Sequence, residues 1–258
     1  MTLTLLMTTG AHAFDHNYED YGNTLKTHVF WLQGGHASVV DYAQLRTKSP
    51  ELQKIERLFS SVSNKEFQEF TRQQQMAFLI NAYNFFTLKL IAENYPIASI
   101  RDLGSVLRST WKRPFFKLLD NQRTLDWVEH EMLRPNYKEP RIHFAINCAS
   151  IGCPALYPTP FTANKLETQL ADTEQRFLKD RSRNRFNTSN NSLMVSRIFE
   201  WFGGDFERPN QTLQQWLASR ANLLADTPES QKQIAAGQFR LQFLSYDWAL
   251  NDRRSTQR

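Results

Sequence analysis

Apolar residues recur at helical spacing through most of the first half of the chain. Leu52, Ile55 and Phe59 mark one face of an amphipathic helix. Residues 78–91 are apolar nearly all round, which is typical of a helix buried in the middle of a domain. Pro96 ends this helix, because proline has no backbone N–H to donate. The first half is therefore predicted to be mainly helical.

The second half of the chain adds strands to this pattern. Short apolar segments flanked by turn formers predict strands at 141–148, 193–199 and 239–248. Helical spacing returns at 162–179 and 213–224. We expect an α+β fold, in which the helical first half packs on a small, mainly antiparallel sheet from the second half.

The first thirteen residues contain no Lys, Arg, Asp or Glu, and they end in the small-x-small pattern of Ala11 to Ala13. This is typical of the apolar part and cleavage site of a secretory signal, although the basic n-region is missing. We expect residues 1–13 to be the remnant of a signal peptide and residues 14–258 to form a single domain, periplasmic or secreted. No other segment approaches the ~20 apolar residues that a membrane span requires, so no transmembrane segment is expected.

Composition narrows the choice of partners. The 258 residues are 41% hydrophobic, which is enough for a sizeable core. The formal net charge of +5 is spread along the chain, and it favours weak attraction to anionic polymers over a nucleic-acid site. We therefore expect no nucleic-acid partner, and a ligand such as a peptide or a cell-envelope polymer.

Candidate chemistry gathers around the two cysteines, Cys148 and Cys153, with His143 just before them. A thiolate is the reactive form of cysteine, and a nearby imidazole or helix N-terminus lowers the thiol pKa. Cys153 precedes Pro154, which suits the first position of a helix. On the predicted strand, His143 and Cys148 point to opposite faces, which counts against His143 as the base for the Cys148 thiol. His130, on a helix that Thr124 is expected to cap, is the other candidate base.

The same cysteines allow a second interpretation. An even number of cysteines in an exported protein favours a disulfide, here between Cys148 and Cys153 across four residues. A buried, inert pair of thiols is a third interpretation. The spacing of the cysteines and histidines matches no common zinc pattern, so we expect neither a metal nor another cofactor.

Polar residues elsewhere could support such a site. Asn81 and Asn84 are three apart in the buried helix and share one face, and buried amides require partners. They either pin the backbone of a neighbouring loop or orient a catalytic histidine. Glu129 is a further candidate to orient an imidazole. Asp205 lies within a predicted turn at 201–206, and we interpret it as part of the solvated surface.

Several blocks of sequence occur in an order that resembles an uncharacterised bacterial and plant family, the domain of unknown function 547. The blocks are Val40-Asp41-Tyr42-Ala43, the run from Phe78 to Asn84, the run from Leu125 to His130, the run from His143 to Pro154, and the run from Phe243 to Trp248. The resemblance implies a domain over nearly the whole mature chain. It also implies a set of characteristic positions: Asn81, Asn84, His130, His143, Cys148 and Cys153. It implies no reaction.

Two functions are consistent with these residues, and whether the protein is an enzyme is left open. One is thiol-dependent hydrolysis or acyl transfer in a cleft, where Cys153 or Cys148 attacks, His130 or His143 is the base, and an asparagine orients it. The other is a non-catalytic envelope module that binds peptide, glycan or a partner protein in an aromatic-lined groove, with a disulfide shaping the rim.

Overall fold

The structure is a computed structural model that describes residues 14–32, 34–105 and 109–256. The predicted signal-peptide remnant, residues 1–13, lies outside the described residues. Within the described part of the chain, no helix combines the length and the apolar character needed to cross a membrane.

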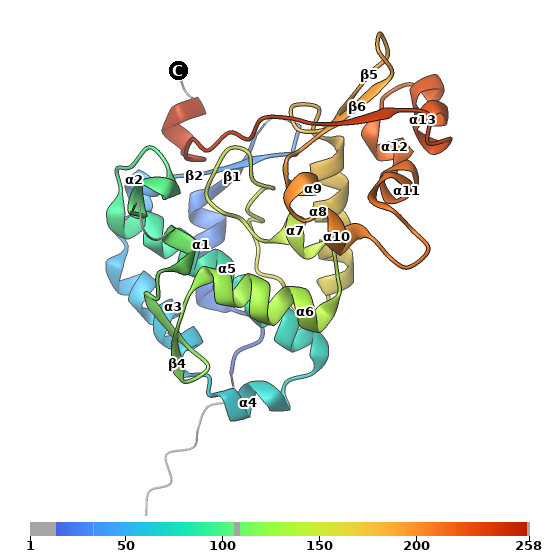
Figure 1. The fold of residues 1–258 in the computed structure, drawn as a ribbon. Coiled ribbons are helices and arrows are strands. Elements are labelled where there is room, and N and C mark those ends of the chain that lie inside the picture. Colours follow the sequence, from blue (N-terminus) through green and yellow to red (C-terminus); the bar gives the residue numbers. More distant parts are fainter. Residues whose placement is uncertain (1–13, 33, 106–108, 257–258) are drawn as a thin grey trace, which may run out of the picture.

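Helix α5, Arg72–Asn94, lies at the centre of the first half (Figure 1). Thr71 and Gln74 form a capping box at its N-terminal end, in which each side chain accepts a hydrogen bond from the other's backbone N–H. Every residue from Met76 to Ala92 is buried. The buried helix predicted from the apolar run is therefore confirmed.

Four helices precede α5 in the chain: α1 (Glu19–His28), α2 (Tyr42–Leu45), α3 (Ser49–Ser61) and α4 (Asn64–Glu69). Aromatic contacts join three of them, α1, α3 and α4, to α5. The apolar stripe of α3 brings the ring of Phe59 to 5.5 Å from Phe78 and 5.4 Å from Phe85. Ring pairs at such distances contribute about 1 kcal/mol each beyond the burial of their area.

The strands form three small sheets, and the mixed α+β class is confirmed. Two are antiparallel pairs: β1 (Val29–Trp31) with β2 (Ser38–Val40), and β3 (Phe116–Leu118) with β4 (Asn121–Arg123). The third contains β5 (Arg185–Asn187), β6 (Ser192–Val195) and β7 (Arg240–Phe243). In this third sheet β6 is central, antiparallel to β5 and parallel to β7.

A second apolar cluster fills the later part of the chain. Its helices are α8 (Leu166–Lys179), α9 (Ile198–Trp201), α10 (Gly203–Phe206), α11 (Leu213–Ala218), α12 (Ala221–Leu224) and α13 (Pro228–Ala235). Phe144, Phe199 and Trp216 are buried together in this cluster. The remaining elements are short: η1 (Ile100–Leu103), η2 (Thr110–Lys112), the π-helical η3 (Trp127–Leu133), α6 (Arg134–Tyr137), α7 (Ile142–Ala145) and η4 (Arg253–Thr256).

The predicted strand at 141–148 is wrong, because the chain turns there into the short helix α7. The backbone N–H of His143 donates to the carbonyl of Pro140, and that of Phe144 donates to the carbonyl of Arg141. A short apolar run does not distinguish a strand from a buried helical turn. The argument that opposite strand faces separate His143 from Cys148 is therefore also wrong.

A C-terminal segment, residues 244–252, leaves β7 and crosses back over the first half of the molecule (Figure 1). The N–H of Leu244 still bonds to β6, at the carbonyl of Val195. Further on, the N–H of Val40 donates to the carbonyl of Asn251, so the same segment reaches β2. The loop that contains both cysteines lies under this segment, and its position depends on both halves of the chain.

Candidate functional site

A pocket of about 240 Å³ lies where the cysteine loop, η3, α9 and the C-terminal segment meet. Its wall is largely aromatic, formed by Tyr83, Trp111, Trp201, Phe202, Tyr246 and Trp248. Four residues singled out from the sequence also line it: Glu129, His130, His143 and Cys148. Pockets with apolar walls and a few convergent polar groups are the usual place for a ligand.

The two sulfurs are joined in a disulfide between Cys148 and Cys153. This is the second of the interpretations that the sequence left open, and in this state neither cysteine is a free thiol. Cys153 does not precede a helix, because the chain from Pro154 to Tyr157 is extended loop. The predicted activation of Cys153 by a helix dipole is therefore wrong.

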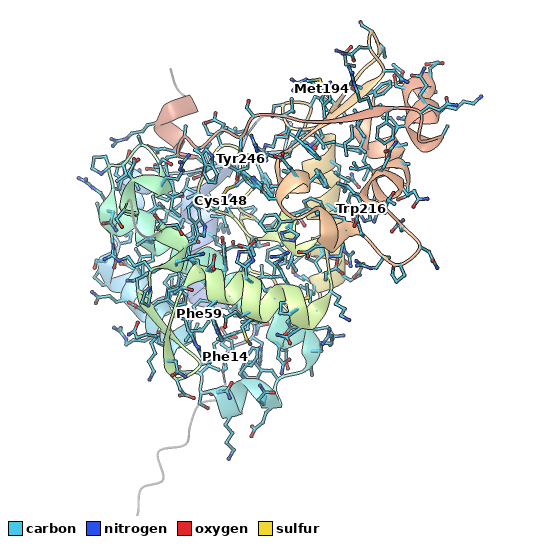
Figure 2. All side chains as sticks on the ribbon, in the orientation of Figure 1. Phe14, Phe59, Cys148, Met194, Trp216 and Tyr246 are labelled. Atoms are coloured by element: carbon cyan, nitrogen blue, oxygen red, sulfur yellow. A yellow bond between two sulfur atoms is a disulfide. The ribbon has the colours of Figure 1, made fainter. Side chains whose placement is uncertain are left out.

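Three donors surround the sulfur of Cys153. The backbone N–H of Cys148 lies 3.1 Å from Sγ, and that of Ser150 lies 3.3 Å away. The hydroxyl of Tyr246 lies 3.1 Å from the same sulfur and 3.1 Å from the sulfur of Cys148. Tyr246 and Cys148 are both labelled in Figure 2. Cys153 itself is only 2% exposed, whereas Cys148 is half-buried and lines the pocket.

Close packing fixes the cysteine loop against the C-terminal segment. The N–H of Gly152 donates to the carbonyl of Asp247 at 2.9 Å, and that of Ile151 donates to the carbonyl of Ala249 at 2.8 Å. A Cβ at position 152 would lie 3.0 Å from both the Asp247 carbonyl and the Tyr246 ring. Glycine is needed here because there is no space for a side chain.

Removing the disulfide is expected to have a modest effect on stability. A disulfide that closes so short a loop restricts the unfolded chain little, and the double change Cys148→Ser, Cys153→Ser should lower the free energy of unfolding by roughly 2 kcal/mol. Urea denaturation of oxidised wild type and the double variant measures this. A loss above roughly 5 kcal/mol would mean that the disulfide, and not the surrounding hydrogen bonds, holds the loop.

The two asparagines of α5 bond to the backbone of loops. Asn84 donates to the carbonyl of Ala145 at 2.9 Å and accepts from the N–H of Asn147 at 2.8 Å. Asn81 makes the same pair of bonds with Phe161, at 2.7 and 2.9 Å. These are the contacts expected of residues that pin a neighbouring loop. Neither asparagine lines the pocket.

Glu129 is a buried acid that lines the pocket and is only 6% exposed. Burial raises the pKa of Glu129 to about 7, because the charged form loses its hydration, and a hydrogen bond from Tyr83 and the charge of Arg134 oppose this rise. Glu129 therefore exchanges a proton near neutral pH. Such perturbed acids cluster at functional sites.

The ion pair between Arg134 and Asp205 lies between the two histidines of the pocket and contacts both of them. Nε2 of His143 lies 2.7 Å from the carboxylate of Asp205, and Nε of Arg134 lies 2.6 Å from the same oxygen. Nη1 of Arg134 also lies 2.7 Å from Nδ1 of His130. The ring of His143 stacks on Phe202 at a centroid distance of 4.2 Å.

Burial and neighbouring charges set the protonation states of the two histidines and of Asp205. Burial lowers the pKa of both His143 and His130, and the carboxylates of Asp205 and Asp126 oppose this. Burial alone would raise the pKa of Asp205, but hydrogen bonds from His143 and Arg134 hold it well below its usual value. At neutral pH, the carboxylate of Asp205 thus orients the neutral imidazole of His143, which is the arrangement of a general base.

Sequence reasoning missed Asp205, which was interpreted as solvated surface. In place of the predicted turn at 201–206, α9 ends at Trp201 and α10 begins at Gly203, and α10 carries Asp205 to His143. The two are 62 positions apart, so no local spacing could have indicated the pair. Both imidazoles line the same pocket as Cys148, but no hydrogen bond joins a sulfur to an imidazole within the described residues.

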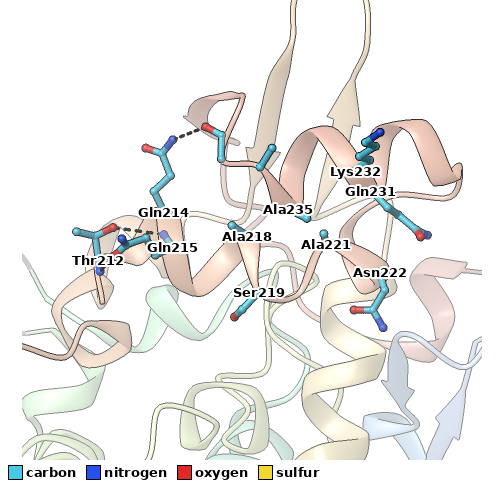
Figure 3. Close-up of a pocket in the computed structure, with 12 residues that line it drawn as sticks. Thr212, Gln214, Gln215, Ala218, Ser219, Ala221, Asn222, Gln231, Lys232 and Ala235 are labelled. Atoms are coloured by element: carbon cyan, nitrogen blue, oxygen red, sulfur yellow. Dashed lines mark hydrogen bonds between the residues drawn. The ribbon is translucent and has the colours of Figure 1, made fainter. Parts of the chain in front are cut away.

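Another hollow, of about 850 Å³, lies between α11, α12 and α13 (Figure 3). Its described lining consists of amide, hydroxyl and small side chains, with Lys232 as the single charged residue. It offers no pair of groups for acid–base or nucleophilic chemistry. Nor do the described ranges of the chain contain three His, Cys, Asp or Glu side chains grouped to hold a metal ion.

These features define an α+β protein with an aromatic pocket, a buried acid, an imidazole–carboxylate pair and a disulfide at the rim. The family model described as a protein of unknown function, DUF547, matches residues 67–178, so the chain is similar to that family over this part of its length. The match contains all the site residues predicted from the sequence, whereas Asp205, Trp201 and Tyr246 lie outside it. No match was found to a curated protein or to a solved structure. That residues 14–258 form one domain stays a prediction.

Proposed function

We propose that this protein is exported and binds one sugar unit of a cell-envelope glycan in the aromatic pocket. Export is supported by the disulfide, since such bonds persist in oxidising compartments and are rare in the cytosol. The net charge of +5 favours an anionic polymer as the partner. The disulfide then has the role of shaping the pocket rim.

The observation that carries this proposal is an aromatic cluster open to solvent beside buried polar groups. Trp201 is 42% exposed, and its ring lies 4.9 Å from Tyr246 and 5.6 Å from Trp248. The apolar face of a sugar ring packs on such side chains, while its hydroxyls hydrogen-bond to groups such as Glu129 and His130. At about 240 Å³ the pocket is smaller than most drug-sized sites, so it suits one unit of a longer chain.

Titration with soluble peptidoglycan fragments tests the proposal, with tryptophan fluorescence and calorimetry as the readouts. We expect Trp201→Ala to weaken binding at least about tenfold, because it removes one ring of the wall. Phe243→Ala is the matched control, since Phe243 is 40% exposed and does not line the pocket. No binding by the wild type, or equal weakening by the two variants, would contradict the proposal.

A second candidate function is thiol-dependent hydrolysis or acyl transfer after reduction of the disulfide. It is favoured by Cys148, which lines the same pocket as His130 and His143. In this function the Cys148 thiolate attacks an acyl carbon, and the bond from that carbon to its alcohol or amine breaks. His143, oriented by Asp205 and not by an asparagine, protonates the leaving group, and water or a second acceptor then takes the acyl group from the thioester and restores the thiolate. The test is hydrolysis of a nitrophenyl ester by reduced protein, compared with Cys148→Ser. Equal rates for the two proteins would rule it out.

A further inference from the structure

We propose that the Cys148–Cys153 disulfide is a site of thiol–disulfide exchange, in which a small thiol enters the pocket and attacks the sulfur of Cys148. This activity needs neither a glycan nor an acyl substrate, and it is tested by different measurements. Three observations carry it: the unequal exposure of the two sulfurs, the donors around one of them, and the bonds that hold the loop without the disulfide.

Exposure decides which sulfur is attacked. Cys148 is half-buried and lines the pocket, whereas Cys153 is 2% exposed and does not. A thiolate that enters the pocket therefore reaches the sulfur of Cys148 first. The thiolate is the attacking species, so the incoming thiol releases its proton to solvent before it enters the pocket.

The donors around Cys153 stabilise the leaving group. When the incoming thiolate forms a bond to Cys148 Sγ, the bond between the cysteines breaks and its electron pair stays on Cys153 Sγ. That sulfur already faces two backbone N–H groups and the hydroxyl of Tyr246, within 3.1 to 3.3 Å. Hydrogen bonds to a thiolate are stronger than those to a disulfide sulfur, so these donors favour the product of the attack. Burial raises the pKa of Tyr246, which keeps its hydroxyl protonated as a donor.

A second molecule of the same thiol completes the reaction. It attacks the small-molecule sulfur of the mixed disulfide and displaces Cys148 as a thiolate. In total two thiols are oxidised to one disulfide, the protein disulfide is reduced to two thiols, and the two protons pass to the cysteines or to solvent. The reductant is the thiol itself, so no other reactant is required.

Hydrogen bonds hold the cysteine loop in place after the disulfide is broken. The amide of Asn147 donates to the carbonyl of Pro154 at 2.7 Å and accepts from the N–H of Ala149 at 2.8 Å, which joins the two ends of the loop. Arg183 donates to the carbonyl of Cys153, and Gly152 bonds to Asp247. The dithiol form therefore retains the donors around Cys153.

Exposure of the folded wild type to reduced glutathione, followed by alkylation and fragmentation mass spectrometry, tests the site of attack. We expect the trapped mixed disulfide to carry glutathione on Cys148 and the alkyl group on Cys153. Glutathione on Cys153, or no exchange in the folded protein, would overturn the proposal.

Two sets of variants test the role of the donors. We expect Tyr246→Phe to slow exchange about tenfold, because a hydrogen bond to a charged group is lost. Tyr137→Phe, far from the sulfurs, should keep the wild-type rate. If Tyr246→Phe does not fold, the thiol pKa of Cys153 in Cys148→Ser decides the matter. It should lie below the ordinary value of about 8.5 and below that of Cys148 in Cys153→Ser. A Cys153 pKa at or above the ordinary value would overturn the proposal.

Discussion

As the pH rises from 4.5 to about 7, titration of Glu129 is expected to lower the free energy of unfolding of the wild type. The variant Glu129→Gln has no such group and should not show this decrease. The native state keeps a proton on Glu129 in this range, because burial raises its pKa from 4.5 to about 7. The unfolded chain has already released that proton. The native state therefore binds more protons, and its free energy of unfolding falls with rising pH, by roughly 3 kcal/mol over the range. Urea denaturation at several pH values measures the effect.

The difference between variant and wild type is the quantity to compare. His143 and His130 have lowered pKa values, so their contribution to stability rises with pH and partly hides that of Glu129 in the raw profile. Glu131→Gln is the matched control, because Glu131 lies on the same helical turn but is exposed. If the stability of Glu129→Gln relative to wild type did not increase with pH, Glu129 would be ionised throughout and the site would hold no exchangeable proton.

A proton on Glu129 also matters for binding. A protonated acid donates a hydrogen bond, and an ionised one only accepts. Near neutral pH the pocket therefore changes from favouring a hydrogen-bond acceptor of the ligand to favouring a donor. Sugar hydroxyls serve as both donors and acceptors, so the proposed ligand fits either state. Its affinity should therefore vary with pH far less than the stability of the protein.

The sequence predicts those parts of the fold that depend on local spacing. The apolar run at 78–91 identified α5 because a helix without a polar face has to be buried. The periodicity of 162–179 likewise predicted α8, whose helix begins at Leu166. Where the apolar run is short, as at 141–148, spacing cannot separate strand from helical turn, and the strand prediction was wrong.

The candidate site depends on contacts between distant segments, which local spacing does not encode. Residue chemistry alone selected Glu129, His130, His143 and Cys148, and all four line one pocket. The sequence did not indicate the residues that contact these four side chains and set their chemistry. Asp205, Tyr246 and Trp201 reach the pocket only through α9, α10 and the C-terminal segment, and no pattern within the chain pairs them with η3 or the cysteine loop.

Asn84→Ala is expected to lower the free energy of unfolding by about 3 kcal/mol. The change removes two buried hydrogen bonds, to the carbonyl of Ala145 and from the N–H of Asn147. It leaves both backbone groups without this partner in the interior, and each such loss costs about 1–3 kcal/mol. Chemical denaturation of the variant measures the effect, and a loss below about 1 kcal/mol would mean that the loop finds other partners.

Asn81→Ala separates the effect on stability from an effect on the site. Asn81 makes an equivalent pair of bonds to Phe161, so this variant should lose a similar amount of stability. Asn84, however, holds Asn147, whose side chain joins the two ends of the cysteine loop. We therefore expect Asn84→Ala, but not Asn81→Ala, to change how fast glutathione opens the disulfide in the folded protein. Equal exchange rates in the two variants would show that Asn84 supports the fold without positioning the site.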